Sequence, residues 1–188
     1  NRRYSPSIQM IQNAVKDRRN PLVIIYRVNA GYLPPDHWTQ GEQGGGRMIG
    51  EGCHMLDVFA MLIGAPVANI TCAPLRNARY GLDTVSATIE YAEGSVATLH
   101  YISSGNPSLA KEYVEVYSDG DVYVVNDYKT LKTHGSSKIS SFTNDKGHIR
   151  ELEAFTNSIK SGIMPISLED LESVAETSIK IDSLAKGL

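Results

Sequence analysis

The spacing of hydrophobic residues predicts a helix and then a strand at the start of the chain. Ile8, Ile11 and Val15 recur at helical intervals, and Ser5 in front of them is a typical helix N-cap, followed by a proline in the first turn. The run LVIIYRVNA at residues 22–30 is apolar and rich in β-branched side chains. Such a run is too apolar for an exposed strand, so we expect it inside a sheet.

A loop and a second helix are expected next. Glycine and proline dominate residues 31–46, and long ordered loops of this kind are often functional. Helical spacing resumes over residues 48–63, and Gly64 and Pro66 mark the end of that helix. Its expected apolar face consists of Met48, Gly52, Met55, Leu56, Phe59 and Ile63.

The middle of the chain changes to short β-rich segments separated by turn signals such as AEGS and SDGD. Several segments alternate between apolar and polar positions, as Val114 and Val116 do against Glu115 and Tyr117. Sequential short strands of this kind predict an antiparallel meander. The six segments span residues 67–75, 84–92, 95–103, 112–119, 121–127 and 129–135.

Two helices are expected to close the chain. The first covers residues 147–162, with an apolar face formed by Ile149, Leu152, Phe155 and Ile159. The second begins at the N-cap Ser167, and its buried face is expected to contain Leu171, Val174, Ala175, Ile179 and Leu184. The fold class is therefore α+β, a mostly antiparallel open sheet with helices packed on one face. The other sheet face would be free for a second subunit.

Composition narrows the possible functions. The chain has 188 residues, 41% hydrophobic content and a net charge of −3, which fits one domain over residues 1–188. It has no basic patch and no apolar run of about 20 residues, so neither nucleic acid nor a membrane is an expected partner. Two cysteines form no metal or disulfide pattern, so no metal is expected, and a reduced cytoplasmic setting fits best. The opening NRRYSP is typical of an entry in mid-protein.

His54 is the main candidate for chemistry. In a helix, Glu51 and Asp57 lie three residues before and after it and would share its side. Imidazole titrates near neutral pH and can pass a proton to or from a hydroxyl, and a neighbouring carboxylate raises its basicity. The preceding Gly45 and Gly46 would let a ligand approach the start of the helix. The alternative is a buried polar pair or a surface histidine without a catalytic role.

The end of the first strand and its loop form a second candidate site. Arg27, Asn29 and Tyr32 supply donors for a hydroxyl-rich ligand, and His37 with Trp38 would add an aromatic wall. Equally, the aromatic residues could anchor the loop on the core.

Four further residues have weaker patterns. Arg2 and Arg3 could bind an anion, although terminal arginines are usually solvated, and His148 at a helix start could face the same site as His54. His100, within a strand, is better explained as a packed histidine.

The motif GGGRMIGEGCHMLD resembles the signature of the C-terminal domain of the glucose–fructose oxidoreductase / inositol dehydrogenase family (Gfo/Idh/MocA). Three other segments resemble the same family in the same order: NRRYSP, YRVNAGYLP, and GHIRELEAFTNSIKSG with the closing PISLEDLESVAETSIKIDSL. The segment RMIGEGCH most resembles the corresponding segment of a subgroup fused to a zinc-type alcohol dehydrogenase module.

The resemblance implies a two-domain oxidoreductase that acts on the CH–OH group of a sugar, nucleotide sugar or cyclitol. An absent N-terminal Rossmann domain would bind NAD or NADP, and residues 1–20 would cross over from it. The present domain would bind substrate and form a homodimer, or a dimer of dimers, through its sheet. His54 matches the family's catalytic histidine, and Arg3, Gly45 and Gly46 would lie near the cofactor.

Two departures from the family pattern matter. Gly50 stands where the family commonly has an aspartate, and Glu51 could supply a carboxylate instead. The dinucleotide fingerprint GxGxxG is absent from these residues, so the isolated chain is predicted to be inactive. Two alternatives stay open: a binding or assembly module that has lost catalysis, and a variant that performs β-elimination or glycoside chemistry through a transient oxidation.

Overall fold

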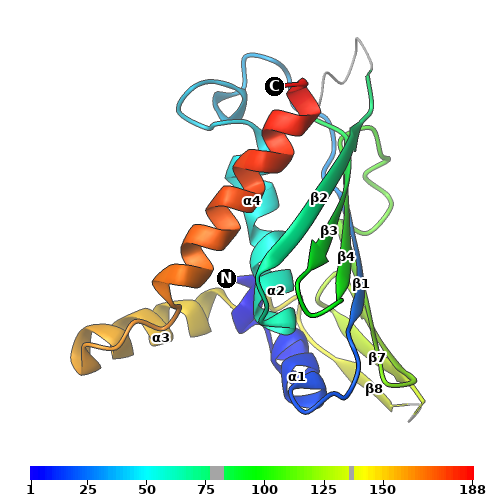
Figure 1. The fold of residues 1–188 in the computed structure, drawn as a ribbon, viewed down its shortest axis with the longest axis vertical. Helices are drawn as coiled ribbons and strands as arrows, with labels where there is room; N and C mark the ends of the chain where they lie inside the picture. The colour runs from blue at the N-terminus through cyan, green and yellow to red at the C-terminus, as the bar shows by residue number, and fades with distance from the viewer. Residues whose placement is uncertain (77–82, 136–137) are drawn as a thin grey trace.

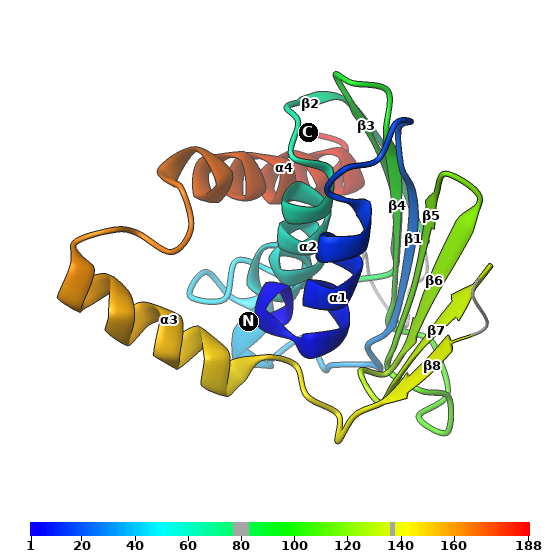
Figure 2. The ribbon, with the colours of Figure 1, turned by 90° about the horizontal axis from the view of Figure 1, so that it is seen from below.

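One large twisted sheet forms a wall of the molecule, and the helices cover only one of its two faces (Figures 1 and 2). The computed structural model describes residues 1–76, 83–135 and 138–188. The α+β class expected from the sequence is confirmed. The helices are α1 (Pro6–Val15), α2 (Cys53–Ile63), α3 (His148–Ser161) and α4 (Leu168–Lys186), with the short turns η1 (Arg2–Tyr4), η2 (Trp38–Gln40) and η3 (Met48–Gly52).

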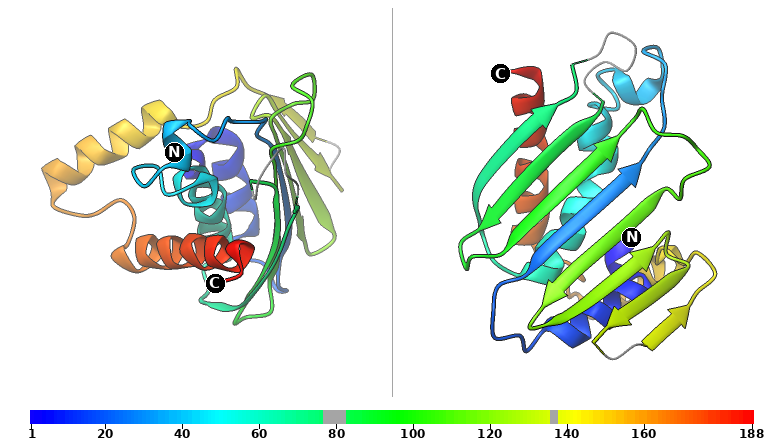
Figure 3. Two further views of the ribbon diagram at one scale, coloured as in Figure 1. Left: turned by 90° about the horizontal axis from the view of Figure 1, so that it is seen from above. Right: turned by 90° about the vertical axis from the view of Figure 1, so that its right-hand side faces the viewer.

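The sheet has the strand order β2-β3-β4-β1-β5-β6-β7-β8, and its uncovered face is seen in the right panel of Figure 3. The strands are β1 (Val23–Asn29), β2 (Val67–Pro74), β3 (Val85–Tyr91), β4 (Val96–Ile102), β5 (Glu112–Ser118), β6 (Asp121–Asn126), β7 (Thr130–His134) and β8 (Lys138–Ser141). The expected meander is correct for β2 to β4 and for β5 to β7. It is wrong as one continuous ladder, because β1 separates β4 from β5 and runs parallel to β4. The short polar β8 was not predicted.

The first helix forms as its sequence predicts. The Ser5 hydroxyl accepts a hydrogen bond from the backbone N–H of Ile8 at 3.2 Å, which satisfies one free donor of the first turn. Ile8, Ile11 and Val15 are fully buried in the core between the sheet and α2. Burying such side chains stabilises the fold by about 1.5–3 kcal/mol each. This packing fixes the N-terminal segment against the sheet.

The second helix is preceded by a π-helical turn rather than being α-helical throughout. Residues Met48–Gly52 form this turn, and Cys53–Ile63 continue as α-helix until Gly64 ends it in the left-handed region at φ +70°. A π turn contains more residues than an α turn. Residues spaced three apart across the junction therefore do not return to the same side of the helix. The predicted apolar face is nevertheless buried along its whole length, including Gly52 in the π turn.

The packing of the last two helices differs from the prediction. The apolar face predicted on α3 is exposed along its whole length, and no residue of α3 is buried. On α4, Leu171, Ala175 and Ile179 are exposed, and only Val174 and Leu184 are partly buried. The buried residues of α4 are instead Thr177, Ser178, Ile181 and Ala185. Their mostly small side chains let α4 pack against α2 and β2.

Candidate functional site

The N-terminal segment is held on the helix side of the sheet by two buried arginines. The Arg2 guanidinium donates to the Glu112 carboxylate at the start of β5, with Nε–Oε2 and Nη2–Oε1 distances of 2.7 and 3.0 Å. Glu112 is fully buried and also accepts from Lys146 Nζ at 2.6 Å and from the Tyr26 hydroxyl at 2.6 Å. Burial alone would raise the pKa of Glu112, but the hydrogen bonds and charge of Arg2, with Lys146, lower it to about 2.

Arg3 makes the second anchor, on α2. Its Nε lies 3.0 and 2.9 Å from the two carboxylate oxygens of Asp57, and its Nη1 lies 3.6 Å from the Asp170 carboxylate on α4. Arg3 is therefore already paired with two carboxylates in this structure. Through Arg3, the N-terminal segment is therefore joined to Asp57 on α2 and to Asp170 on α4.

His54 lies one turn before Asp57, next to this anchored segment. Its ring is half-buried, and no hydrogen bond to it is formed within the described residues. Burial lowers the pKa of His54 below its usual value, and the positive charge of Arg2 lowers it further. The imidazole is thus neutral at pH 7 and has a ring nitrogen free to accept a proton.

Glu51 belongs to a different group of side chains. Its carboxylate accepts from Arg47 Nε at 2.9 Å and from the Tyr101 hydroxyl at 2.8 Å, and Lys111 Nζ lies 3.9 Å away. The expected contact between Glu51 and His54 is not formed within the described residues, because Glu51 lies in the π turn. Burial raises the pKa of the Tyr101 hydroxyl, so this phenol stays protonated and donates to Glu51. Glu51 and Lys111 remain partly open to solvent.

The glycine run folds closely onto its own loop. A side chain on Gly44 would collide with the backbone of Thr39, and the Gly46 N–H donates to the Thr39 carbonyl at 2.9 Å. Gly45 and Gly46 have φ values of +67° and +91°, which only glycine adopts readily. A Cβ on Gly46 would lie 3.5 Å from the Asp182 carboxylate on α4. These glycines therefore shape the loop that leads into α2.

The side chains of Arg27 and Asn29, at the end of β1, face away from the side of the sheet that carries His54. Core-facing and outward residues alternate along β1, with Tyr26 and Val28 buried in the core. Arg27 lies on the open face of the sheet, where it stacks over the Tyr113 ring and donates to the Ala110 carbonyl at 3.0 Å. The Asn29 amide donates to the carbonyls of Asn106 and Leu109 and so holds the loop before β5. The structure does not bring Arg27 and Asn29 together with His54.

The aromatic residues of the long loop are exposed, and the predicted anchoring role fits them poorly. Trp38 is 66% exposed and Tyr32 is 48% exposed. His37 Nδ1 accepts the Thr39 N–H at 3.3 Å and caps η2, and the His37 ring lies 6.0 Å from that of Trp38. His148, at the start of α3, lies with its Nε2 2.7 Å from Asn1 Nδ2. His148 therefore adjoins the N-terminal segment next to His54.

Sequence reasoning missed the residues that shape both groups. Glu112, Lys146, Arg47, Tyr101 and Lys111 were not singled out. One signal could have found Glu112, because it continues the buried alternation of Val114 and Val116. A charged residue at a buried position of a strand requires an oppositely charged partner.

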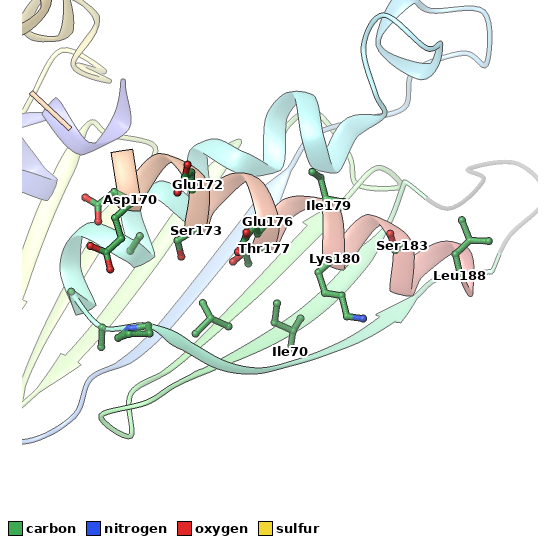
Figure 4. A pocket seen from close by; sticks show the side chains of 16 residues that line it. Ile70, Asp170, Glu172, Ser173, Glu176, Thr177, Ile179, Lys180, Ser183 and Leu188 are labelled. Carbon is green, nitrogen blue, oxygen red and sulfur yellow. The ribbon is translucent and has the colours of Figure 1, made fainter. Parts of the chain in front are cut away.

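A groove of about 1010 Å³ lies elsewhere, between α4 and β2 (Figure 4). Its lining includes Ile70, Glu172, Glu176 and Ile179, and it contains neither His54 nor Glu51. In the described ranges, no set of three His, Cys, Asp or Glu side chains could hold a metal ion. Across the same ranges, no helix has the length and apolarity needed to span a bilayer.

The fold and the histidine motif agree with a known family of oxidoreductases. Residues 20–118 match the model described as "Oxidoreductase family, C-terminal alpha/beta domain". The chain therefore belongs to the Gfo/Idh/MocA family, as the C-terminal domain, and the resemblance noted in the sequence is confirmed. A search among curated proteins gave no match.

Solved structures of oxidoreductases share the fold at low sequence identity. UDP-N-acetylglucosamine 3-dehydrogenase GnnA from Acidithiobacillus ferrooxidans aligns with a TM-score of 0.75 and 18% identity, covering 96% of this chain and 58% of its own. GenD2 from gentamicin A biosynthesis, in complex with NAD, gives 0.72 and 16%, covering 99% and 60%. An oxidoreductase domain protein from Kribbella flavida gives 0.75 and 13%, covering 98% and 62%. This chain thus spans about three fifths of the length of these structures.

Proposed function

We propose that residues 1–188 form the substrate-binding half of an oxidoreductase acting on the CH–OH group of a sugar, nucleotide sugar or cyclitol. The cofactor would be NAD or NADP, which exchanges a hydride with the substrate carbon when bound. The observation that carries the proposal is the half-buried, neutral His54 ring without a hydrogen-bond partner in the described residues. Such a ring can take the hydroxyl proton during oxidation and return it during reduction.

The residues present suit only the reacting end of such a cofactor. The 188 residues contain no GxGxxG fingerprint, so the adenine half would be held by another part of the full-length protein. The charge of Arg3 is already neutralised by Asp57. Arg3 would therefore support cofactor binding by holding the N-terminal segment in place, rather than by binding a phosphate directly. Gly45 and Gly46 would contribute by allowing close approach of the loop. We therefore propose that the isolated domain is inactive.

Substrate binding is proposed around His54 and the loop before it. Glu51, held by Arg47 and Tyr101, would accept hydrogen bonds from substrate hydroxyls as a second carboxylate beside the catalytic histidine. The exposed Trp38, with Tyr32 and His37, would close over the ligand, and His148 would line the side next to Asn1. Arg27 and Asn29 would contribute indirectly, because their hydrogen bonds to the carbonyls of Ala110 and Asn106 hold the loop before β5 in place.

The proposal includes a cytoplasmic homodimer, or a dimer of dimers, through the open sheet face. Val23 and Tyr117 are paired across β1 and β5, and both side chains are exposed on that face. Light scattering of the full-length protein should give at least a dimer mass, and Val23→Lys with Tyr117→Lys should halve it. An unchanged mass would place the interface elsewhere.

The activity test uses the full-length protein, with absorbance at 340 nm recorded for NAD and NADP against sugars, nucleotide sugars and inositols. His54→Ala should lower turnover by about 10²-fold or more. His100→Ala is the matched control, because His100 lies on the open sheet face and contacts Ser86 at 2.9 Å. Turnover that is indifferent to His54 would contradict the proposed role. Turnover by the isolated 188 residues would contradict their proposed inactivity.

One observation favours a second function, a binding or assembly module without catalysis. Gly50 replaces the family's common aspartate, and a Cβ there would lie 3.1 Å from the Gly44 carbonyl oxygen. The loop therefore packs so closely against Gly50 that an aspartate side chain there would require it to shift. Nucleotide binding without any turnover across the panel would favour this module. Turnover with no net change in NADH would instead identify elimination chemistry through a transient oxidation.

A further inference from the structure

The α3 helix is an amphipathic arm whose apolar side is uncovered. Ile149, Leu152, Phe155 and Ile159 form one stripe along it, with exposed fractions of 73, 65, 59 and 70%. The linker after the helix continues the stripe with Ile163 and Met164, which are exposed as well. Figure 2 shows α3 projecting from the helix layer, away from the sheet. Short isolated helices are marginal in water, so a helix of this kind requires a covering surface.

The base of the arm is fixed on the N-terminal segment. The backbone nitrogen of Asn1 lies 3.1 Å from the Glu151 carboxylate, and Asn1 Nδ2 lies 2.7 Å from His148 Nε2. Gly147, just before α3, approaches the Asn1–Ser5 backbone so closely that a Cβ would lie about 2.5 Å from it. Arg2 and Arg3 are buried and hold this segment on Glu112 and Asp57. Any chain that leads into Asn1 therefore arrives beside the first turn of α3.

The similar structures indicate what arrives there. The family model describes a C-terminal domain, and about two fifths of the length of the similar structures lies outside the part that this chain covers. We infer that the apolar stripe of α3 docks on the domain that precedes Asn1 in the same polypeptide. That contact would hold the preceding domain beside the half-buried His54, because Asn1 adjoins α3 and is followed directly by Arg2, whose charge acts on His54. The inference rests on the proposed function only for the nucleotide-binding role of that domain.

Photo-cross-linking of the full-length protein tests the contact without measuring turnover. The probe p-benzoylphenylalanine replaces Phe155 in the stripe, and in a matched control it replaces Asn157 on the polar side of α3. A mixture of ¹⁴N- and ¹⁵N-labelled copies then separates links within one chain from links between chains. The expected result is an intrachain cross-link from position 155 to a peptide upstream of Asn1, at a yield at least fivefold above that from position 157.

Three results would overturn the inference. A cross-link between ¹⁴N and ¹⁵N copies would assign the stripe to a second copy of the chain. A cross-link from position 155 only to peptides within residues 1–188 would show that the arm folds back on this domain. Equal low yields at positions 155 and 157 would show that the stripe stays in water. If turnover fails while the expected cross-link forms, the proposed function fails and the docking stands.

Discussion

Arg2 and Glu112 form a bidentate ion pair across 110 residues of sequence, with donor–acceptor distances of 2.7 and 3.0 Å. The pair ties the segment that precedes α1 to the first residue of β5. It is part of a buried network, because Lys146 and the Tyr26 hydroxyl bind the same carboxylate and the Tyr26 and Tyr128 hydroxyls are 2.7 Å apart. Arg2 also lies close enough to His54 for its positive charge to lower the pKa of that ring.

Replacing Glu112 by glutamine should destabilise the fold by about 3–5 kcal/mol, because Arg2 and Lys146 would lose their buried counter-charge. Urea unfolding followed by circular dichroism measures the change in free energy. Glu115→Gln is the matched control on the same strand, since Glu115 contacts only the exposed Tyr117 hydroxyl at 3.0 Å among the described hydrogen bonds. Equal stability of the two variants would argue against the network.

Acid should weaken the fold through the same carboxylate. The pKa of Glu112 is lowered to about 2 from its ordinary 4.5, so ionised Glu112 stabilises the folded state above pH 4.5. That contribution, roughly 3 kcal/mol at its full value, is lost as the pH falls from 4.5 towards 2. Unfolding free energies measured between pH 2 and 7 should fall more steeply for the wild type than for Glu112→Gln. Parallel curves would contradict the assignment.

The pH profile of the full-length enzyme should report His54. Burial and Arg2 lower the pKa of His54 below its ordinary 6.5, so the basic form is present at and above neutral pH. In the oxidation direction, kcat/KM should rise with pH and level off, with a midpoint below 6.5. His54→Gln should remove this limb, whereas His100→Gln should keep it. A midpoint above 6.5 would assign the limb to another group.

The loop before α2 should depend on Gly44. Gly44→Ala places a methyl group against the Thr39 backbone, so we expect a loss of about 1–3 kcal/mol, measured as a lower Tm. Gly41→Ala is the matched control in the same loop, because its Cβ would lie at an ordinary 3.6 Å from the Trp38 carbonyl oxygen. A Tm for Gly44→Ala equal to that of the control would mean that the loop rearranges freely.

Local patterns predicted local structure well. Ser5 caps α1, Gly64 ends α2, and Ser167 accepts from the Asp170 N–H at 3.0 Å, because each depends on a few neighbouring residues. The alternation of the strands also gave the correct faces of β5. The parallel pairing of β1 with β4 could not be read in this way, since it joins distant segments.

Tertiary context decided the rest. The period of Leu152 and Phe155 was predicted correctly, but a period identifies an apolar side without saying what covers it. The prediction that Glu51 and His54 share one side of the helix failed because Glu51 lies in a π turn, which the sequence does not indicate. The residue pattern and the family resemblance both made His54 a candidate, whereas the ion pairs near it came only from the structure.

The central place of β1 has a consequence for synthesis of the protein. Val23 pairs with Val96 on β4 and with Tyr117 on β5, so both partners of β1 are translated more than 70 residues later. At about 5–20 residues per second, the ribosome needs roughly 4 to 15 seconds to reach the first partner. During that interval the apolar β1 has no neighbouring strand, and it is the segment of the nascent chain that a chaperone would protect first. The pairings of β1 thus add many long-range contacts to this fold, as does the packing of α4 on α2 and β2.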